Sequence, residues 1–176
     1  MQIRYIVLHG IADGETARQH AAHAASAAMG RSLHYYVDQT EVQQSVHDRF
    51  IAWHCGTRGV YYHPYCRNEN SIGVALCGQM QTERRRFAPS VIHNAQALVR
   101  ALMARYDIPA EHVLRHYDVT HKTCPAPFVE CAACWTAIPD RTCAYPDIRT
   151  KITNHSFIRK KDKNTPKVDC FRRISI

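Results

Sequence analysis

Residues 114–128 have the sequence LRHYDVTHKTCPAPF, which combines metal-binding side chains with residues that restrict the backbone. Four side chains suited to metal or anion chemistry fall within nine consecutive positions: His116, His121, Lys122 and Cys124. Imidazole and thiolate are the groups that zinc prefers in proteins. The Pro-Ala-Pro run after Cys124 forbids a continuing helix, so we expect a rigid loop, the usual place for chemistry. The segment predicts part of a zinc site that still needs a further ligand.

The missing ligand is predicted near the start of the chain. Residues 3–8 are nearly all apolar and rich in β-branched side chains, which indicates a buried strand that ends at His9. A histidine at the end of a central strand is well placed to point into a cleft. We predict that His9, His116 and Cys124 bind zinc, which leaves a fourth position for water as in catalytic sites. The spacing alone leaves His121 open as an alternative to His116.

Two further residues of the segment have predicted roles. Lys122 lies two positions before Cys124, and an ammonium group there can stabilise the oxyanion that forms when an amide is attacked. Zinc lowers the pKa of a bound water from about 16 toward about 7, which supplies a nucleophile for such an attack. Asp118 either orients a ligand histidine or caps a turn.

The rest of the chain predicts an α/β domain. Expected strands are 3–8, 33–38, 41–46, 71–77 and 111–115, and expected helices are 13–29, 89–106 and one or two turns in 131–138. Gly73, inside a strand, indicates the close approach of another group. We expect a central mixed β-sheet flanked by helices, with the zinc cleft at one edge of the sheet.

Length and charge bound the domain organisation and the partners. The 176 residues suit one domain, predicted at 1–138, followed by an extension at 139–176. The net charge is +8, of which +6 lies from residue 138 onward, so we expect the extension to bind an acidic wall polymer or to pack poorly. The sequence has no nucleic-acid motif and no run of 18 apolar residues. We therefore expect a monomer with no nucleic-acid partner and no membrane span.

The eight cysteines are predicted to be free thiols or metal ligands rather than a disulfide framework. The N-terminus lacks the features of a signal peptide, which predicts synthesis in the reducing cytoplasm. Cys131 and Cys134 have the spacing of a metal or redox pair, and we favour free thiols over a disulfide or a second zinc site with Cys143 and Cys170. A bridge between Cys55 and Cys66 would pin the long loop between them, and it stays open beside free thiols.

Five stretches together resemble one known family in order and spacing: 6–9 (IVLH), 33–38 (LHYYVD), 52–56 (AWHCG), 70–74 (NSIGV) and 116–127. The chain is similar over roughly residues 2–137 to the type-2 N-acetylmuramoyl-L-alanine amidases. These are zinc enzymes of phage endolysins and bacterial autolysins, related to the peptidoglycan recognition proteins. The resemblance implies the α/β fold of that family.

The resemblance also implies an activity and a set of site residues. The activity is cell-wall lysis by hydrolysis of the amide between N-acetylmuramic acid and L-alanine in bacterial peptidoglycan. By position, His9, His116 and Cys124 match the zinc ligands of the family, which favours His116 over His121, and Lys122 matches its lysine near the oxyanion. Action on the wall after release from a host cell is implied for an endolysin, and a cytoplasmic recycling enzyme is the alternative.

The chain departs from the family at the residues that assist the water. Many members carry a glutamate as general base where this chain has Ala75, and others carry a tyrosine where it has Leu33. An alternative function is therefore a non-catalytic module that binds peptidoglycan. His54 and Asn70 are predicted substrate contacts, although Asn70 suits a cap equally well, and Trp53 beside His54 is expected to pack in the core.

Overall fold

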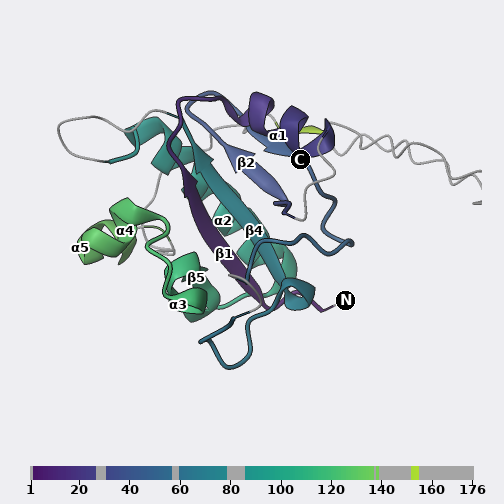
Figure 1. Cartoon of the computed structure of the whole chain (residues 1–176), viewed down its shortest axis with the longest axis vertical. Helices are drawn as coiled ribbons and strands as arrows, with labels where there is room; N and C mark the ends of the chain where they lie inside the picture. Colours follow the sequence, from purple (N-terminus) through teal and green to yellow (C-terminus); the bar gives the residue numbers. More distant parts are fainter. Residues whose placement is uncertain are drawn as a thin grey trace, which may run out of the picture.

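The computed structural model describes residues 2–26, 31–56, 60–78, 86–136, 138 and 152–154. Its centre is a mixed six-stranded sheet with the order β5-β1-β4-β2-β3-β6 (Figure 1). The strands are β1 (Tyr5–Ile11), β2 (Tyr35–Val37), β3 (Val42–Gln44), β4 (Ser71–Cys77), β5 (Val113–Arg115) and β6 (Ile152–Asn154). Only the β2–β3 hairpin is antiparallel among these pairs. The predicted mixed sheet flanked by helices is confirmed.

One face of the sheet forms the main core with helix α2 (Pro89–Tyr106). Alternate residues of β1 and β4, such as Ile6, Leu8 and Val74, point toward this helix because strand side chains alternate between faces. Proline at the first helical position suits the fixed backbone angle of a helix start. Asp107 ends the helix in a left-handed conformation, and its N–H donates to the Met103 carbonyl. The bounds agree with the predicted helix.

The other face of the sheet is covered at its two ends and open between them. Helix α1 (Ala17–Ser26) covers one end, where Ala17 and Ala21 pack on Tyr36 and Ala75. Helix α3 (His116–Thr120) and part of the 50–70 loop cover the other end (Figure 1). Small alanine side chains let α1 lie close to the sheet. The uncovered strip between these elements is where a cleft can form.

Hydrogen bonds at the N-terminus of α1 hold this helix in place. Thr16 and Gln19 form a capping box, which explains why the helix starts later than the predicted residue 13. Asp38, after β2, accepts hydrogen bonds from Ala17 N, Thr40 N and Glu41 N. Burial would raise the pKa of the Asp38 carboxyl, but these bonds outweigh it and lower that pKa. Positions 27–29 of the predicted helix, and Gly30 after it, lie outside the described residues.

The prediction that the segment 114–128 forms a rigid loop was wrong for most of its residues, because it contains two short helices. Helix α3 begins at His116, and a second short helix, α4 (Ala126–Glu130), begins directly after Pro125. Proline breaks a helix only in its interior, and its missing N–H costs nothing in the first turn. The Pro-Ala-Pro run therefore starts a helix instead of preventing one. Two single 3₁₀ turns, Asn68–Asn70 and Ala110–His112, and helix α5 (Ala132–Thr136) complete the described elements.

The structure bears on two other expectations about the chain's C-terminal third. Strand β6 lies inside the predicted 139–176 extension and pairs in parallel with β3, while the remainder of that extension lies outside the described residues. Cys131 and Cys134 form a disulfide, so the preference for free thiols was wrong for this pair. The pairing is local, because the two cysteines stand one turn apart at the start of α5.

The other described cysteines are free and buried. The sulfur atoms of Cys55 and Cys66 lie 3.5 Å apart, within hydrogen-bond distance, and form no disulfide. Cys143 and Cys170, the further ligands considered for a second zinc site, lie outside the described residues. Within the part of the chain that the structure describes, every helix is too short or too polar to cross a membrane.

Candidate metal centre and its cleft

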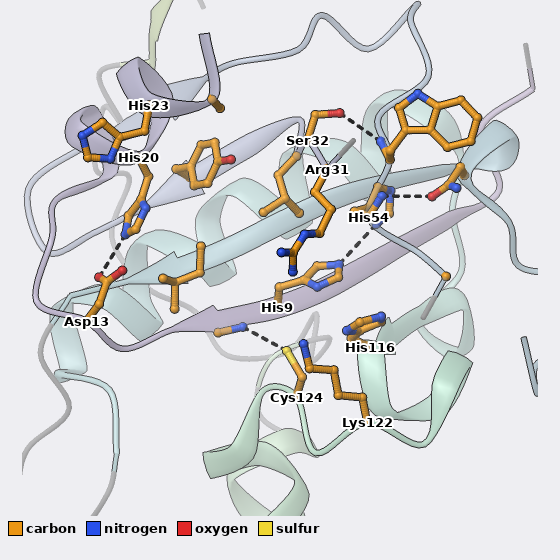
Figure 2. Close-up of a pocket in the computed structure, with 18 of the residues that line it drawn as sticks. His9, Asp13, His20, His23, Arg31, Ser32, His54, His116, Lys122 and Cys124 are labelled. Atoms are coloured by element: carbon orange, nitrogen blue, oxygen red, sulfur yellow. Dashed lines mark hydrogen bonds and ion pairs between the residues drawn. The ribbon is translucent and has the colours of Figure 1, made fainter. Parts of the chain in front are cut away.

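The structure brings the three predicted ligands together. Possible ligand atoms of His9, His116 and Cys124 all lie within 4.8 Å of one another, and all three residues are buried. They come from β1, from the first residue of α3 and from the turn between α3 and α4 (Figure 2). One thiolate and two imidazoles form a donor set that suits zinc and leaves a fourth position open. The group is a candidate metal centre, and metal binding by it stays a prediction.

His9 is positioned by the sheet and by a second histidine. It lies opposite Ala75 in the parallel pairing of β1 with β4, on the face that α2 does not cover. Its Nε2 lies 3.2 Å from Nδ1 of His54, and the other ring nitrogen of His54 lies 3.3 Å from the Ser71 hydroxyl. Burial lowers the pKa of His54 to about 3, so the ring is neutral. The predicted substrate contact His54 thus supports His9, and it also lines the cleft.

His116 has both ring nitrogens buried without a hydrogen-bond partner among the described residues. The Cys55 carbonyl faces the ring but does not complete a hydrogen bond. Unpartnered buried nitrogens are rare in folded proteins, and a metal ion is one way to satisfy them. Burial and the charge of Lys122 lower the pKa of His116 to about 4, which leaves the neutral ring that a metal requires. These observations fit a ligand position.

Asp118 has the second of its two predicted roles. Its carboxylate accepts a hydrogen bond from Arg115 N at 2.8 Å and pairs with the Arg115 guanidinium, so it caps α3. His121 ends the same helix with φ 59° and is exposed. Its ring stacks on Tyr62 at 4.0 Å between centroids, outside the candidate centre. The geometry therefore favours His116 over His121.

Cys124 and Lys122 complete the centre on the side of α3. The Cys124 sulfur accepts a hydrogen bond from Gly10 N at 3.5 Å. Burial raises the pKa of the Cys124 thiol, an effect that this bond and the nearby Lys122 charge partly offset. Lys122 is exposed, and its side chain lies beside Cys124 in Figure 2. Its ammonium group is thus available to a ligand that reaches the centre.

The centre opens into a cleft of about 1110 Å³. At the α1 end of the cleft, His20 lies within hydrogen-bond distance of Asp13, and His23 lies 3.2 Å from Glu15. Arg31 and Trp53 line the cleft on the side of the loop before β2. Trp53 is 57% exposed, so the expectation of core packing was wrong. Sequence reasoning did not identify Arg31, Asp13 or Glu15 as cleft residues.

Asn70 does not line the cleft. Its side-chain oxygen accepts from Arg67 N and its amide donates to the Tyr65 carbonyl, so both groups are used within the loop. This is the cap role that the sequence left open. We therefore leave Asn70 out of the proposed site.

Ala75 occupies the position at which the family resemblance places a glutamate, and its side chain is packed under α1. Ala75 is completely buried against Ala17, Ala21 and Tyr36. Among the described residues that line the cleft, only Asp13 and Glu15 carry carboxylates, and both are engaged by histidines of α1. No carboxylate belongs to the described group around His9, His116 and Cys124.

The fold and the site define an α/β protein with a candidate His–His–Cys metal centre in an open cleft. The chain belongs to the N-acetylmuramoyl-L-alanine amidase family, whose model matches residues 1–127. A probable N-acetylmuramoyl-L-alanine amidase of Bacillus licheniformis is 33% identical over 113 residues, which cover 62% of this chain and 31% of that protein. The amidase XlyA of Bacillus subtilis (strain 168) is 31% identical over 124 residues, 69% of this chain and 39% of XlyA. The chain thus spans about a third of the length of these curated relatives.

Solved structures agree with this assignment. The structure of PlyL superposes with a TM-score of 0.67 at 27% identity, over 79% of this chain and 82% of PlyL. The amidase AmiD from E. coli, in complex with a substrate, superposes with a TM-score of 0.51 at 26% identity. That match covers 68% of this chain and 50% of AmiD.

Gly73 is predicted to be essential to the geometry of the centre. A Cβ atom at this position would lie 2.6 Å from Cγ of His54, so the close approach expected from the sequence is confirmed. Gly73→Ala should displace His54 from His9 and weaken zinc binding by about 10–100-fold, as for other partners of ligand histidines. Competition with a chromogenic chelator measures this affinity.

A matched control separates this effect from a general loss of stability. Val74→Ala removes methyl groups from the opposite face of the same strand, in the main core, without contact to His54. It should lower the unfolding temperature and leave zinc affinity unchanged. Equal zinc affinities in the two variants would contradict the role assigned to the His54 contact.

Proposed function

We propose that the chain is a zinc-dependent amidase that hydrolyses the bond between N-acetylmuramic acid and L-alanine in bacterial peptidoglycan. The observation that carries the proposal is the buried group of His9, His116 and Cys124, next to Lys122, in the cleft of a chain from this family. The endolysin relatives support action on the cell wall.

In this proposal His9, His116 and Cys124 hold the zinc ion. When bound, zinc supplies a Lewis acid that lowers the pKa of a water toward about 7. His54 keeps the His9 ring in position through their shared hydrogen bond. Lys122, beside Cys124 in Figure 2, donates to the oxyanion that forms at the scissile carbonyl, and removing such a donor typically costs about 10²–10³-fold in rate.

The class of substrate is supported by a relative. The AmiD complex contains anhydro-N-acetylmuramic acid-L-Ala-D-γ-Glu-L-Lys as its substrate. We propose a muramoyl peptide of the same class for this chain. An open cleft of about 1110 Å³ has room for several residues on both sides of a scissile amide.

A peptidoglycan-binding module without catalysis is the second candidate. It is favoured by Ala75, whose side chain is buried under α1, and by Leu33, since neither can accept a proton. This function would keep the cleft and its polar rim but would not require turnover. Binding without hydrolysis would be its signature.

The two functions are distinguished by release of dye from covalently dyed bacterial walls. For an amidase we expect release with the zinc-loaded chain, loss of release after zinc is removed by a chelator, and recovery on adding zinc. Full activity after verified removal of all zinc would refute zinc dependence. Sedimentation of the chain with walls, without any release of dye or new amino termini, would support the binding module.

A further inference from the structure

Arg31 occupies a prominent position in the cleft and has no part in the function described above. It precedes β2 in the segment that joins α1 to the hairpin, and it is exposed. Figure 2 shows its side chain extending from the rim into the cleft, on the side of His9. A guanidinium group there is available to a ligand that occupies this part of the cleft.

The backbone next to Arg31 is held firmly. Ser32 N donates to the Trp53 carbonyl at 3.1 Å, and Trp53 N donates to the Ser32 hydroxyl at 3.0 Å. These reciprocal bonds tie the rim to the residue immediately before His54. The position of Arg31 is therefore linked to the centre through the Trp53–His54 segment. A binding group is more effective when its support is ordered in advance.

Three arginines among the described residues are neutralised by a neighbouring carboxylate, whereas Arg31 is not. Arg18 pairs with Glu41 at 2.9 Å, Arg105 with Asp48 at 3.5 Å and Arg115 with Asp118 at 2.6 Å. Within the described ranges no carboxylate lies within ion-pair distance of Arg31.

The charges along the cleft are also separated. Asp13 and Glu15 line its α1 end and are engaged by His20 and His23, whereas Arg31 and Lys122 line the part near the centre. A cleft lined by one sign of charge concentrates ligands of the opposite sign. The region around His9 is thus suited to an anionic group of the substrate.

We propose that Arg31 binds a carboxylate of the stem peptide and so determines which peptides are held for cleavage. This inference rests on the proposed amidase function. In a peptide of the sequence L-Ala-D-γ-Glu-L-Lys, the γ-linkage leaves the α-carboxylate of glutamate free, one residue beyond the L-alanine whose amide is cleaved. A planar guanidinium can hold a carboxylate by two parallel hydrogen bonds. Lys122 beside Cys124 remains for the oxyanion.

The test compares two soluble substrates that differ at one group. Both are N-acetylmuramoyl-L-Ala-D-γ-Glu-L-Lys peptides, and one carries the glutamate α-carboxylate as a carboxamide. We expect the zinc-loaded wild-type chain to cleave the carboxylate with the lower KM. Arg31→Ala should raise that KM by about 10–100-fold, the range for a hydrogen-bonded charge, and change kcat less than threefold. The KM for the carboxamide should change little.

Two control variants locate the effect. Arg31→Lys keeps the charge and should recover part of the difference between the substrates. Arg4→Ala removes an exposed arginine that bonds only Gln2 among the described side chains, so it should leave both KM values unchanged. All variants should retain the zinc content of the wild type.

The possible results either support or overturn the assignment of Arg31. If Arg31→Ala changes the two KM values equally, or changes neither, the assignment of Arg31 is overturned. If the wild type cleaves neither substrate, the amidase function fails, and calorimetric binding of the same two peptides replaces KM as the readout. Preference of the wild type for the carboxylate, lost in Arg31→Ala, would then still support the inference, and equal binding would overturn it.

Discussion

Cys124→Ser is expected to remove zinc from the chain. Amide hydrolysis should fall by far more than about 100-fold, which is the upper cost of losing a residue that only supports a metal ligand. Serine has nearly the shape of cysteine, but its hydroxyl does not ionise near neutral pH as a metal-bound thiol does. The Gly10 N–H that donates to the Cys124 sulfur would still have an acceptor. The fold should therefore survive while the donor set loses its only thiolate.

Zinc per chain, measured by atomic emission, and dye release from walls are the two readouts. Cys77→Ser is the matched control because Cys77 is also a free, buried cysteine, located in β4 among the residues under α1. That variant should keep its zinc even if its unfolding temperature falls. Unchanged zinc content in Cys124→Ser would remove Cys124 from the centre and with it the basis of the proposed mechanism.

The elements with strong local patterns were predictable from the sequence. Strand β4 and helix α2 have the predicted bounds, because a short run of buried apolar residues and a long helical stripe followed by Asp107-Ile108-Pro109 are encoded locally. The hairpin of β2 and β3 also forms around the expected turn. The meeting of His9 with His116 and Cys124, more than a hundred positions away, was predicted from the need for a third ligand and from the family resemblance. In the structure it results from the parallel pairing of β1 with β5.

The errors have two causes. A local rule was applied too broadly, or tertiary contacts overrode it. Pro125 was expected to end regular structure, yet it precedes a helix in which its missing N–H is harmless. Trp53 was expected to pack in the core, but two hydrogen bonds between its backbone and Ser32 hold it at the rim of the cleft. Arg31 carries no pattern in the sequence that distinguishes it from a solvated arginine. Its place in the cleft is seen only in the folded structure, where the segment before β2 brings it to the side of His9.

Ala75→Glu is expected to raise the rate of amide hydrolysis by about 10²–10⁴-fold, the usual contribution of a general base. The sheet register explains why this position matters. Ala75 lies directly opposite His9 on one side and Tyr36 on the other, so all three side chains project from the same face. A carboxylate at position 75 would thus project beside a ligand of the candidate centre. It is also the position at which the family resemblance places a glutamate.

The substitution has a structural cost that the experiment must separate from the chemical gain. Ala75 is completely buried under Ala17 and Ala21, so a longer side chain must displace α1 or extend toward the centre. Burial also raises the pKa of a carboxyl group, which brings a base closer to neutral pH. Ala75→Gln has the same size without a proton acceptor and should lower the unfolding temperature similarly while giving no gain in rate. A large gain for glutamate over glutamine would mean that the wild-type centre lacks only its base. Equal rates would mean that a carboxylate at position 75 does not act as a base, and that any hydrolysis by the chain depends on another group in the cleft.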